Sequence, residues 1–174
     1  MNYLIETANL SETSEIASLV NSAYRGETSK KGWTTEADLL DGQRTDASLL
    51  TKTINEKNKF ILTLRKQNES EILACVCLEF FEDKCYLWML TVKPTLQNSG
   101  IGKILISESE NFARKHHIKR MSLGVIHQRI ELISWYERRG YLKTDQVEDF
   151  PYDNPEFGIP KVNDLHFVMF EKIL

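Results

Sequence analysis

Hydrophobic residues follow two different spacings along this chain, and the spacing changes from segment to segment. Alternating apolar positions, or short unbroken apolar runs rich in β-branched and aromatic residues, predict β-strands. Apolar positions that recur every three or four residues predict amphipathic helices. The predicted strands cover residues 2–7, 59–65, 71–81, 86–92, 119–126 and 165–173, with one more beginning at residue 141, and the predicted helices cover residues 11–25, 46–55, 101–117 and 128–139.

The most informative stretch covers residues 86–103. A buried strand is stopped by Pro94, a polar loop with Gly100 and Gly102 follows, and a helix then begins. Unpaired backbone N–H groups converge at the start of such a helix, and the helix dipole adds positive potential there. The sequence therefore predicts a cradle for a phosphate or pyrophosphate, although these residues alone also fit an ordinary glycine-containing turn.

Spacing excludes two common cradles. A Walker-type loop needs Ser or Thr after Gly102-Lys103, and Ile104 stands there. A dinucleotide-binding fingerprint needs a third glycine three residues after Gly102, and Leu105 stands there.

The strand, helix and strand over residues 86–126 predict a right-handed parallel crossover. The short turns between the strands of residues 59–92 predict antiparallel hairpins before it. The glycine loop then lies at the carboxyl end of a parallel pair, where open α/β sheets bind ligands.

Composition limits the classes of function. The 174 residues fit one domain, 1–174, with 41% hydrophobic and 27% charged residues and a formal net charge of −3. The charge argues against nucleic acid as a partner. The apolar runs are shorter than the roughly 20 residues that cross a bilayer, and no secretory signal is visible, so we expect no membrane partner and a cytoplasmic location.

The three cysteines, Cys75, Cys77 and Cys85, all fall in predicted strands. Cys75 and Cys77 share one strand face and do not form a CxxC pair, so buried free thiols are expected rather than a disulfide. No metal site is expected.

Two motifs resemble those of the GCN5-related N-acetyltransferase (GNAT) family. Gln97-x-x-Gly100-x-Gly102 is similar to the family's acyl-CoA pyrophosphate loop. Residues 136–141 are similar to its Tyr-Glu-(Lys or Arg)-x-Gly-(Phe or Tyr) segment, and they follow the loop at the family's distance. The order of predicted elements also resembles the family over essentially the whole chain.

The resemblance implies a fold and a function. The fold is α/β (α+β), with a mixed, mostly antiparallel sheet of about seven strands, about four flanking helices and a parallel crossover at the cofactor loop. The function is acetyl transfer from acetyl-CoA to a primary amine of a small molecule, or of a peptide or protein. A homodimer is left open as the oligomeric state.

The resemblance also implies residue roles. Leu90 and Val92, with Thr91 between them, match the strand that pairs with the pantetheine arm, and the Leu90 N–H matches the oxyanion donor. The pyrophosphate loop consists of Gln97, Asn98, Ser99, Gly100, Ile101, Gly102 and Lys103. Tyr136, next to Trp135, matches the tyrosine whose hydroxyl faces the thioester sulfur. Arg129 stands where the family often has Asn, which leaves its contact open between cofactor and acceptor.

Acyl transfer to an amine needs a base, because only a neutral amine attacks and a lysine-like amine has a pKa of about 10.4. Glu79 and Glu36 are the candidates, and either carboxylate also fits a solvated or salt-bridged group. The acceptor is expected to lie against residues with an aromatic and acidic character suited to a cationic amine. They are Tyr24, Trp33, Glu36, Phe150 and Tyr152. For Trp33 the alternative is a plug over the core.

Two other classes of protein fit parts of the sequence. A domain of the same fold that senses acyl-CoA without turnover fits the lack of an obvious base, whereas Tyr136 favours an enzyme. An enzyme that uses nucleoside triphosphates lacks its Lys-Ser/Thr pair.

Overall fold

The computed structural model describes residues 2–174. Its helices and strands are, in chain order, β1 (Tyr3–Thr7), η1 (Leu10–Glu12), α1 (Thr13–Tyr24), α2 (Gly26–Ser29), β2 (Leu40–Asp41), α3 (Ala47–Asn55), β3 (Lys59–Lys66), β4 (Ala74–Phe81), β5 (Lys84–Val92), η2 (Pro94–Leu96), α4 (Ile101–Lys115), β6 (Arg120–Ile126), α5 (Ile130–Glu137), β7 (Leu142–Asp149), η3 (Pro155–Phe157), β8 (Ile159–Pro160) and β9 (His166–Ile173).

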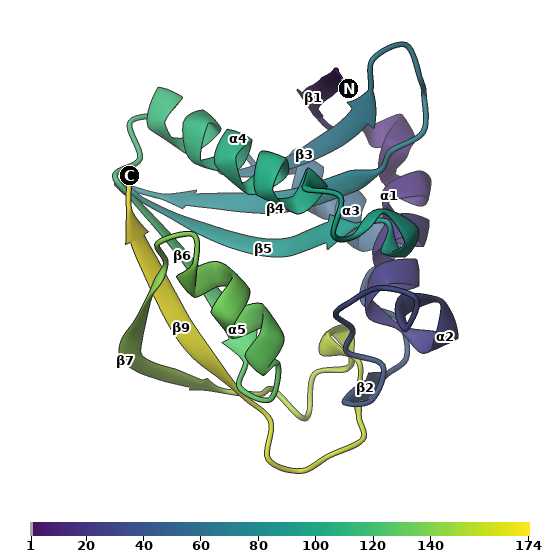
Figure 1. Cartoon of the computed structure of the whole chain (residues 1–174), viewed down its shortest axis with the longest axis vertical. Coiled ribbons are helices and arrows are strands. Elements are labelled where there is room, and N and C mark those ends of the chain that lie inside the picture. Colours follow the sequence, from purple (N-terminus) through teal and green to yellow (C-terminus); the bar gives the residue numbers. More distant parts are fainter. Residues whose placement is uncertain (1) are drawn as a thin grey trace.

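The main sheet has seven strands in the order β1-β3-β4-β5-β6-β9-β7. Every neighbouring pair is antiparallel except β5 and β6, which run parallel and are joined through α4. The mixed sheet and the parallel crossover are therefore confirmed (Figure 1).

Helices cover both faces of the sheet. Alternate residues of the central strands face opposite sides, so Leu62 and Val76 pack with α4 and α5 in one apolar cluster. Ile61, Cys75 and Cys77 pack with α1 and α3 in another. All three cysteines are buried and free, as the sequence predicted.

A β-bulge interrupts β5. The register with β4 passes from Cys77↔Trp88 to Cys75↔Thr91, so β5 carries one extra residue, and Met89 has a φ of 56°. Leu87 packs in the cluster with α4, whereas Met89 packs in the cluster with α1. The Thr91 hydroxyl donates to the Met89 carbonyl at 2.9 Å within the bulge. After the bulge, the side chains of β5 again alternate between the two faces of the sheet, but odd and even positions have exchanged faces.

Strands β5 and β6 separate soon after they meet. Their register covers only Lys84, Cys85 and Tyr86 on β5. Figure 1 shows the two strands diverging from this point. In the part of the chain that the structure describes, the β6-facing edge of β5 therefore has no strand partner from Leu87 onward.

Some boundaries differ from the sequence prediction. The helix expected over residues 101–117 ends at Lys115, because His117 is left-handed (φ 62°) and the N–H groups of His117 and Ile118 bond to the carbonyls of Arg114 and Ala113. The two-stranded sheet of β2 and β8 was not expected. Within residues 2–174, no helix is both long and apolar enough to span a membrane.

Candidate active site

A cavity of about 770 Å³ opens beside the point where β5 and β6 separate. Its walls come from these two strands and from β4 and β9, from α1 and α5, and from the segments around β2 and β7. Of the site residues predicted from sequence, the lining includes Tyr24, Glu36, Glu79, Leu90, Arg129, Tyr136 and Phe150. Trp33 and Tyr152 lie outside the lining, and so do Thr91, Val92, Trp135 and the glycine loop.

Tyr136 is buried on α5 and lines the cavity. Its ring packs edge-on against Trp135 and Tyr141, with ring centres 5.0 and 5.6 Å away. Burial, with a smaller contribution from Tyr24, raises the pKa of the Tyr136 hydroxyl far above its usual value. The hydroxyl therefore keeps its proton at neutral pH and is available as a hydrogen-bond donor.

Tyr24 holds the bulged part of β5. Its hydroxyl donates to the Leu90 carbonyl at 3.0 Å. Burial, reinforced by the negative charge of Glu36, raises the pKa of Tyr24 to about 12, so this donor also stays protonated. Tyr24, at the end of α1, thus positions the Leu90 backbone of β5.

Three buried charged side chains meet next to Tyr24. The Glu36 carboxylate accepts from Arg25 Nη1 at 2.5 Å and from Arg129 Nη1 at 2.8 Å, and Arg129 Nη2 donates to Thr34 Oγ1 at 2.7 Å. The Nε atoms of Arg25 and Arg129 are buried without a hydrogen-bond partner among residues 2–174. Sequence reasoning missed Arg25 entirely, and no local signal in the sequence marks it.

These ion pairs settle the charge of Glu36. Burial alone would raise its pKa, but the charges of Arg129, Arg25 and Arg44 outweigh burial, and the net effect is a lowered pKa. An ionised carboxylate held by two guanidinium groups is a poor proton acceptor at neutral pH. The geometry thus weighs against Glu36 as the base.

Glu79 lies on β4 and lines the cavity. Its carboxylate is 3.7 Å from Lys59 Nζ, and its side chain is partly exposed. In register it faces Tyr86 across β4 and β5. Its role as the base stays a prediction.

Arg44 also lines the cavity, although no motif in the sequence marks it. Its Cζ atom lies 5.6 Å from the centre of the Tyr24 ring and 6.0 Å from that of Trp88. Its guanidinium group has no ion pair within residues 2–174. Around Tyr24, the three guanidinium groups of Arg25, Arg44 and Arg129 outnumber the one carboxylate of Glu36. Elsewhere, the cavity lining carries Glu79, Glu148, Asp149 and Glu156.

The start of α4 forms the predicted anion cradle. Gly100 precedes the helix in a left-handed conformation (φ 90°), and a side chain there would meet no atom within 4 Å. No side chain caps α4 among the described residues, so the first backbone N–H groups of the helix remain free of side-chain acceptors. This open, uncapped helix start fits a pyrophosphate.

Gln97 ties the cradle to the irregular segment before β2. Its Oε1 accepts from the Trp33 N–H at 2.9 Å, and its Nε2 donates to the Val92 carbonyl at 3.3 Å. A Cβ atom on Gly32 would lie only 2.3 Å from that Oε1. The Gln97 side chain therefore forms hydrogen bonds within the protein, and the backbone of this loop remains available to a ligand.

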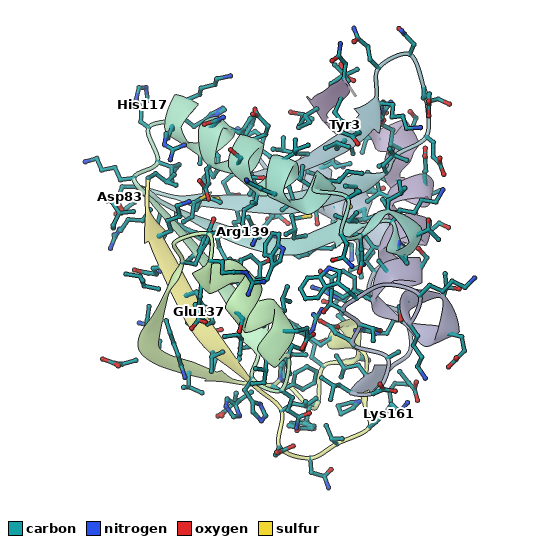
Figure 2. The ribbon with its side chains drawn as sticks, viewed as in Figure 1. Tyr3, Asp83, His117, Glu137, Arg139 and Lys161 are labelled. Carbon is teal, nitrogen blue, oxygen red and sulfur yellow. The ribbon has the colours of Figure 1, made fainter. Side chains whose placement is uncertain are left out.

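Trp135 joins α5 to the cradle. A Cβ atom on Gly102 would lie 3.4 Å from the Trp135 ring, so the glycine permits close contact between α4 and α5. Arg139 places its Cζ atom 3.4 Å from the centre of the Trp135 ring and donates to the Trp135 carbonyl at 2.6 Å. Figure 2 shows Arg139 between the two helices.

The sequence profile described as "Acetyltransferase (GNAT) family" matches residues 14–141, which is most of the chain. The chain belongs to the GNAT acetyltransferase family. This match includes the cradle, Tyr136 and the segment that follows it, as the two motifs implied.

Solved N-acetyltransferase structures share the fold of this chain. The ribosomal-protein-S18-alanine N-acetyltransferase of Escherichia coli matches with a TM-score of 0.71 at 12% identity, over 98% of this chain and 93% of that one. The PaiA N-acetyltransferase of Thermoplasma acidophilum, solved in complex with coenzyme A, matches with a TM-score of 0.68 at 19% identity, over 100% of both chains. At these identities the likeness concerns the fold.

Among curated relatives, the uncharacterised protein YxbD of Bacillus subtilis is 27% identical over 74 residues, which are 42% of this chain and 45% of YxbD. The match thus spans about half the length of this curated relative.

Proposed function

We propose that this GNAT protein is an acetyl-CoA-dependent N-acetyltransferase that transfers acetyl to the primary amine of a small molecule. One observation carries the proposal: the unpaired edge of β5 and the protonated Tyr136 hydroxyl border one cavity, beside an uncapped helix start. A protein that only senses acyl-CoA has no need for a proton donor there.

Different segments of the chain hold different parts of acetyl-CoA. The N–H groups at the start of α4, with Lys103 as a neighbouring cation, hold the pyrophosphate of CoA. The β5 edge at Leu90 and Val92 holds the pantetheine arm, and Tyr24 fixes the Leu90 carbonyl that belongs to this edge. Acetyl-CoA, when bound, supplies an acetyl group activated as a thioester.

Two side chains handle protons. Glu79, or a water that it orders, accepts the proton of the ammonium form of the acceptor, so that a neutral amine attacks. Tyr136 keeps its proton and is the donor available for the sulfur that leaves. The new bond joins the amine nitrogen to the acetyl carbon, and the bond that breaks joins this carbon to sulfur. The nitrogen then gives up its second proton as the amide forms, the departing sulfur takes one from Tyr136, and the released proton restores the Tyr136 hydroxyl directly or through solvent.

Location is a further part of the proposal. Three buried free thiols suit a reducing compartment, and we place the protein in the cytoplasm.

Acceptor-dependent release of CoA thiol tests the function. The purified chain is incubated with acetyl-CoA and a panel of primary amines, and thiol formation is followed by absorbance. We expect thiol release above the hydrolytic background with at least one small amine, and a matching acetylated product by mass spectrometry. Tight CoA binding without acceptor-dependent release across the panel would instead support the sensing module.

A further inference from the structure

Arg44 is held in place by its backbone. Asn21 Oδ1 accepts from the N–H groups of Arg44 and Thr45 at 2.6 and 3.3 Å, and Asn21 Nδ2 donates to the Thr45 carbonyl at 2.8 Å. The segment that carries Arg44 is thus fixed to α1 before any ligand binds, which reduces the entropy lost when a ligand is bound.

The nearby carboxylates do not neutralise Arg44. Asp46 is occupied as the N-cap of α3, accepting from the Leu49 N–H at 2.8 Å. Glu36 is already shared by Arg25 and Arg129. Glu156 borders the same cavity but forms no ion pair within residues 2–174. A guanidinium group that lines a cavity and lacks a partner is a ready site for a carboxylate.

The Arg44 site lies within the length of one side chain of the proposed reaction position. The Tyr24 ring lies beneath the Arg44 guanidinium, 5.6 Å from its Cζ, and the hydroxyl of the same tyrosine bonds to the Leu90 carbonyl. A molecule that reaches from Arg44 to Leu90 therefore spans roughly one tyrosine side chain. This separation suits an amino acid whose carboxylate and reacting amine belong to the same small molecule.

We propose that Arg44 binds the carboxylate of the acceptor, and that the acceptor is an amino-acid-like amine rather than a simple cationic amine or polyamine. The inference rests on the proposed function, since it names the acceptor of the same site. Arg129, fixed by Glu36 and Thr34, is a second guanidinium group near this ring, with its Cζ atom 6.0 Å from the Tyr24 ring centre. The carboxylate thus meets in Arg44 a guanidinium group that the protein has already placed and that forms no ion pair within residues 2–174.

Matched acceptor pairs test the proposal. Lysine is compared with cadaverine and ornithine with putrescine, because each pair differs only by the carboxylate. For the unmodified protein we expect kcat/KM to favour the carboxylate-bearing member by at least about tenfold, the effect of a charge-assisted hydrogen-bonded pair. Arg44→Gln should reduce that preference by about tenfold or more, mainly through KM, and Arg44→Lys should restore part of it.

Two controls separate this proposal from folding effects and from the proposed function. Arg114→Gln, on the outer face of α4 near Asn111, should leave the preference unchanged. Calorimetric titration of lysine into the CoA complex provides a readout without turnover. If lysine binds to the unmodified protein and Arg44→Gln abolishes this binding, the carboxylate site is supported even when no acetyl is transferred. The absence of acetyl transfer would overturn only the proposed transferase function.

The opposite pattern overturns the inference alone. If amines are acetylated with equal kcat/KM whether or not they carry a carboxylate, and Arg44→Gln changes both alike, Arg44 does not select the acceptor. The same conclusion follows if lysine and ornithine neither bind nor react while other amines do.

Discussion

At the scale of single residues, Tyr136 is a buried side chain that lines the cavity and is held by its aromatic neighbours. Tyr136→Phe keeps the ring and removes the proton donor. We expect kcat to fall by at least about tenfold, with little change in the Kd for CoA, because general acids commonly contribute that much or more. Steady-state kinetics and calorimetry measure the two quantities.

Tyr141→Phe is the matched control for this change. Its hydroxyl donates to Glu110 at 3.2 Å, outside the cavity lining, so kcat should be unaffected. If Tyr136→Phe leaves turnover intact, the hydroxyl has no part in the reaction.

Glu36 is a second residue whose environment determines its chemistry. Glu36→Gln removes the charge that balances Arg25 and Arg129, and we expect a loss of about 3 kcal/mol in the free energy of unfolding, because breaking a buried pair leaves uncompensated charge. Chemical denaturation measures this loss. Glu27→Gln, at a surface pair with Lys30, is the control and should leave the free energy of unfolding nearly unchanged.

The pH dependence of the Glu36 contribution has a definite sign. Since the folded protein lowers the pKa of Glu36 below its ordinary value of 4.5, the stabilisation is complete above that value and is lost as the pH falls through the lower folded pKa. The difference between the unmodified protein and Glu36→Gln should therefore be constant near neutral pH and shrink in acid. A difference that grows in acid would contradict the assigned charge state.

At the scale of secondary-structure elements, the loop before α4 offers a test that isolates charge. Gly100 has a left-handed backbone conformation with open space around it. Asn and Asp are nearly equal in size and tolerate this conformation about equally, so the two substitutions differ mainly in charge. We expect Gly100→Asp to weaken CoA binding far more than Gly100→Asn, by at least about tenfold, because a carboxylate would repel the pyrophosphate. Equal affinities in calorimetry would mean that the pyrophosphate lies elsewhere.

The sequence predicted the helices and strands that are determined by the spacing of neighbouring residues. The helical spacing of Ile101 and Leu105, and the stop at Pro94, placed α4 and β5 and therefore the cradle between them. The bulge at Met89 was not predicted, because Trp88, Met89 and Leu90 form an unbroken apolar run that carries no sign of a change in phase.

The buried charge cluster could not be predicted for a different reason. Glu36 is 11 residues from Arg25 and 93 residues from Arg129, and only the packed fold brings the three together. Glu36 was therefore considered as a base, although its partners make it an ionised structural carboxylate. Arg44 was missed because nothing in its neighbouring sequence indicates that it borders a cavity.

At the scale of the whole molecule, the sheet consists of two parts that meet only where β5 and β6 begin. The β1, β3, β4 and β5 strands carry α4 on one face, and β6, β9 and β7 form the other part with α5 near them (Figure 1). Direct strand pairing joins the parts at Lys84, Cys85 and Tyr86, and contacts such as that of Trp135 with Gly102 join them near the cradle. A ligand held between the strands adds a further connection across this gap.

CoA binding should therefore stabilise the molecule as a whole and protect both sides of the gap. At a CoA concentration of about 100 times Kd, linkage adds about 2.7 kcal/mol, which for a chain of this size raises Tm by about 5–10 °C. Hydrogen exchange should slow at the β5 edge from Leu87 to Val92 and at the start of α4, and also in α5 around Trp135, because the ligand and the Trp135 contact restrain both parts. Gly100→Asp should show neither effect. Protection confined to α4, with β5 exchanging as before, would mean that CoA is held by its phosphates alone and that the open strand edge has no part in binding.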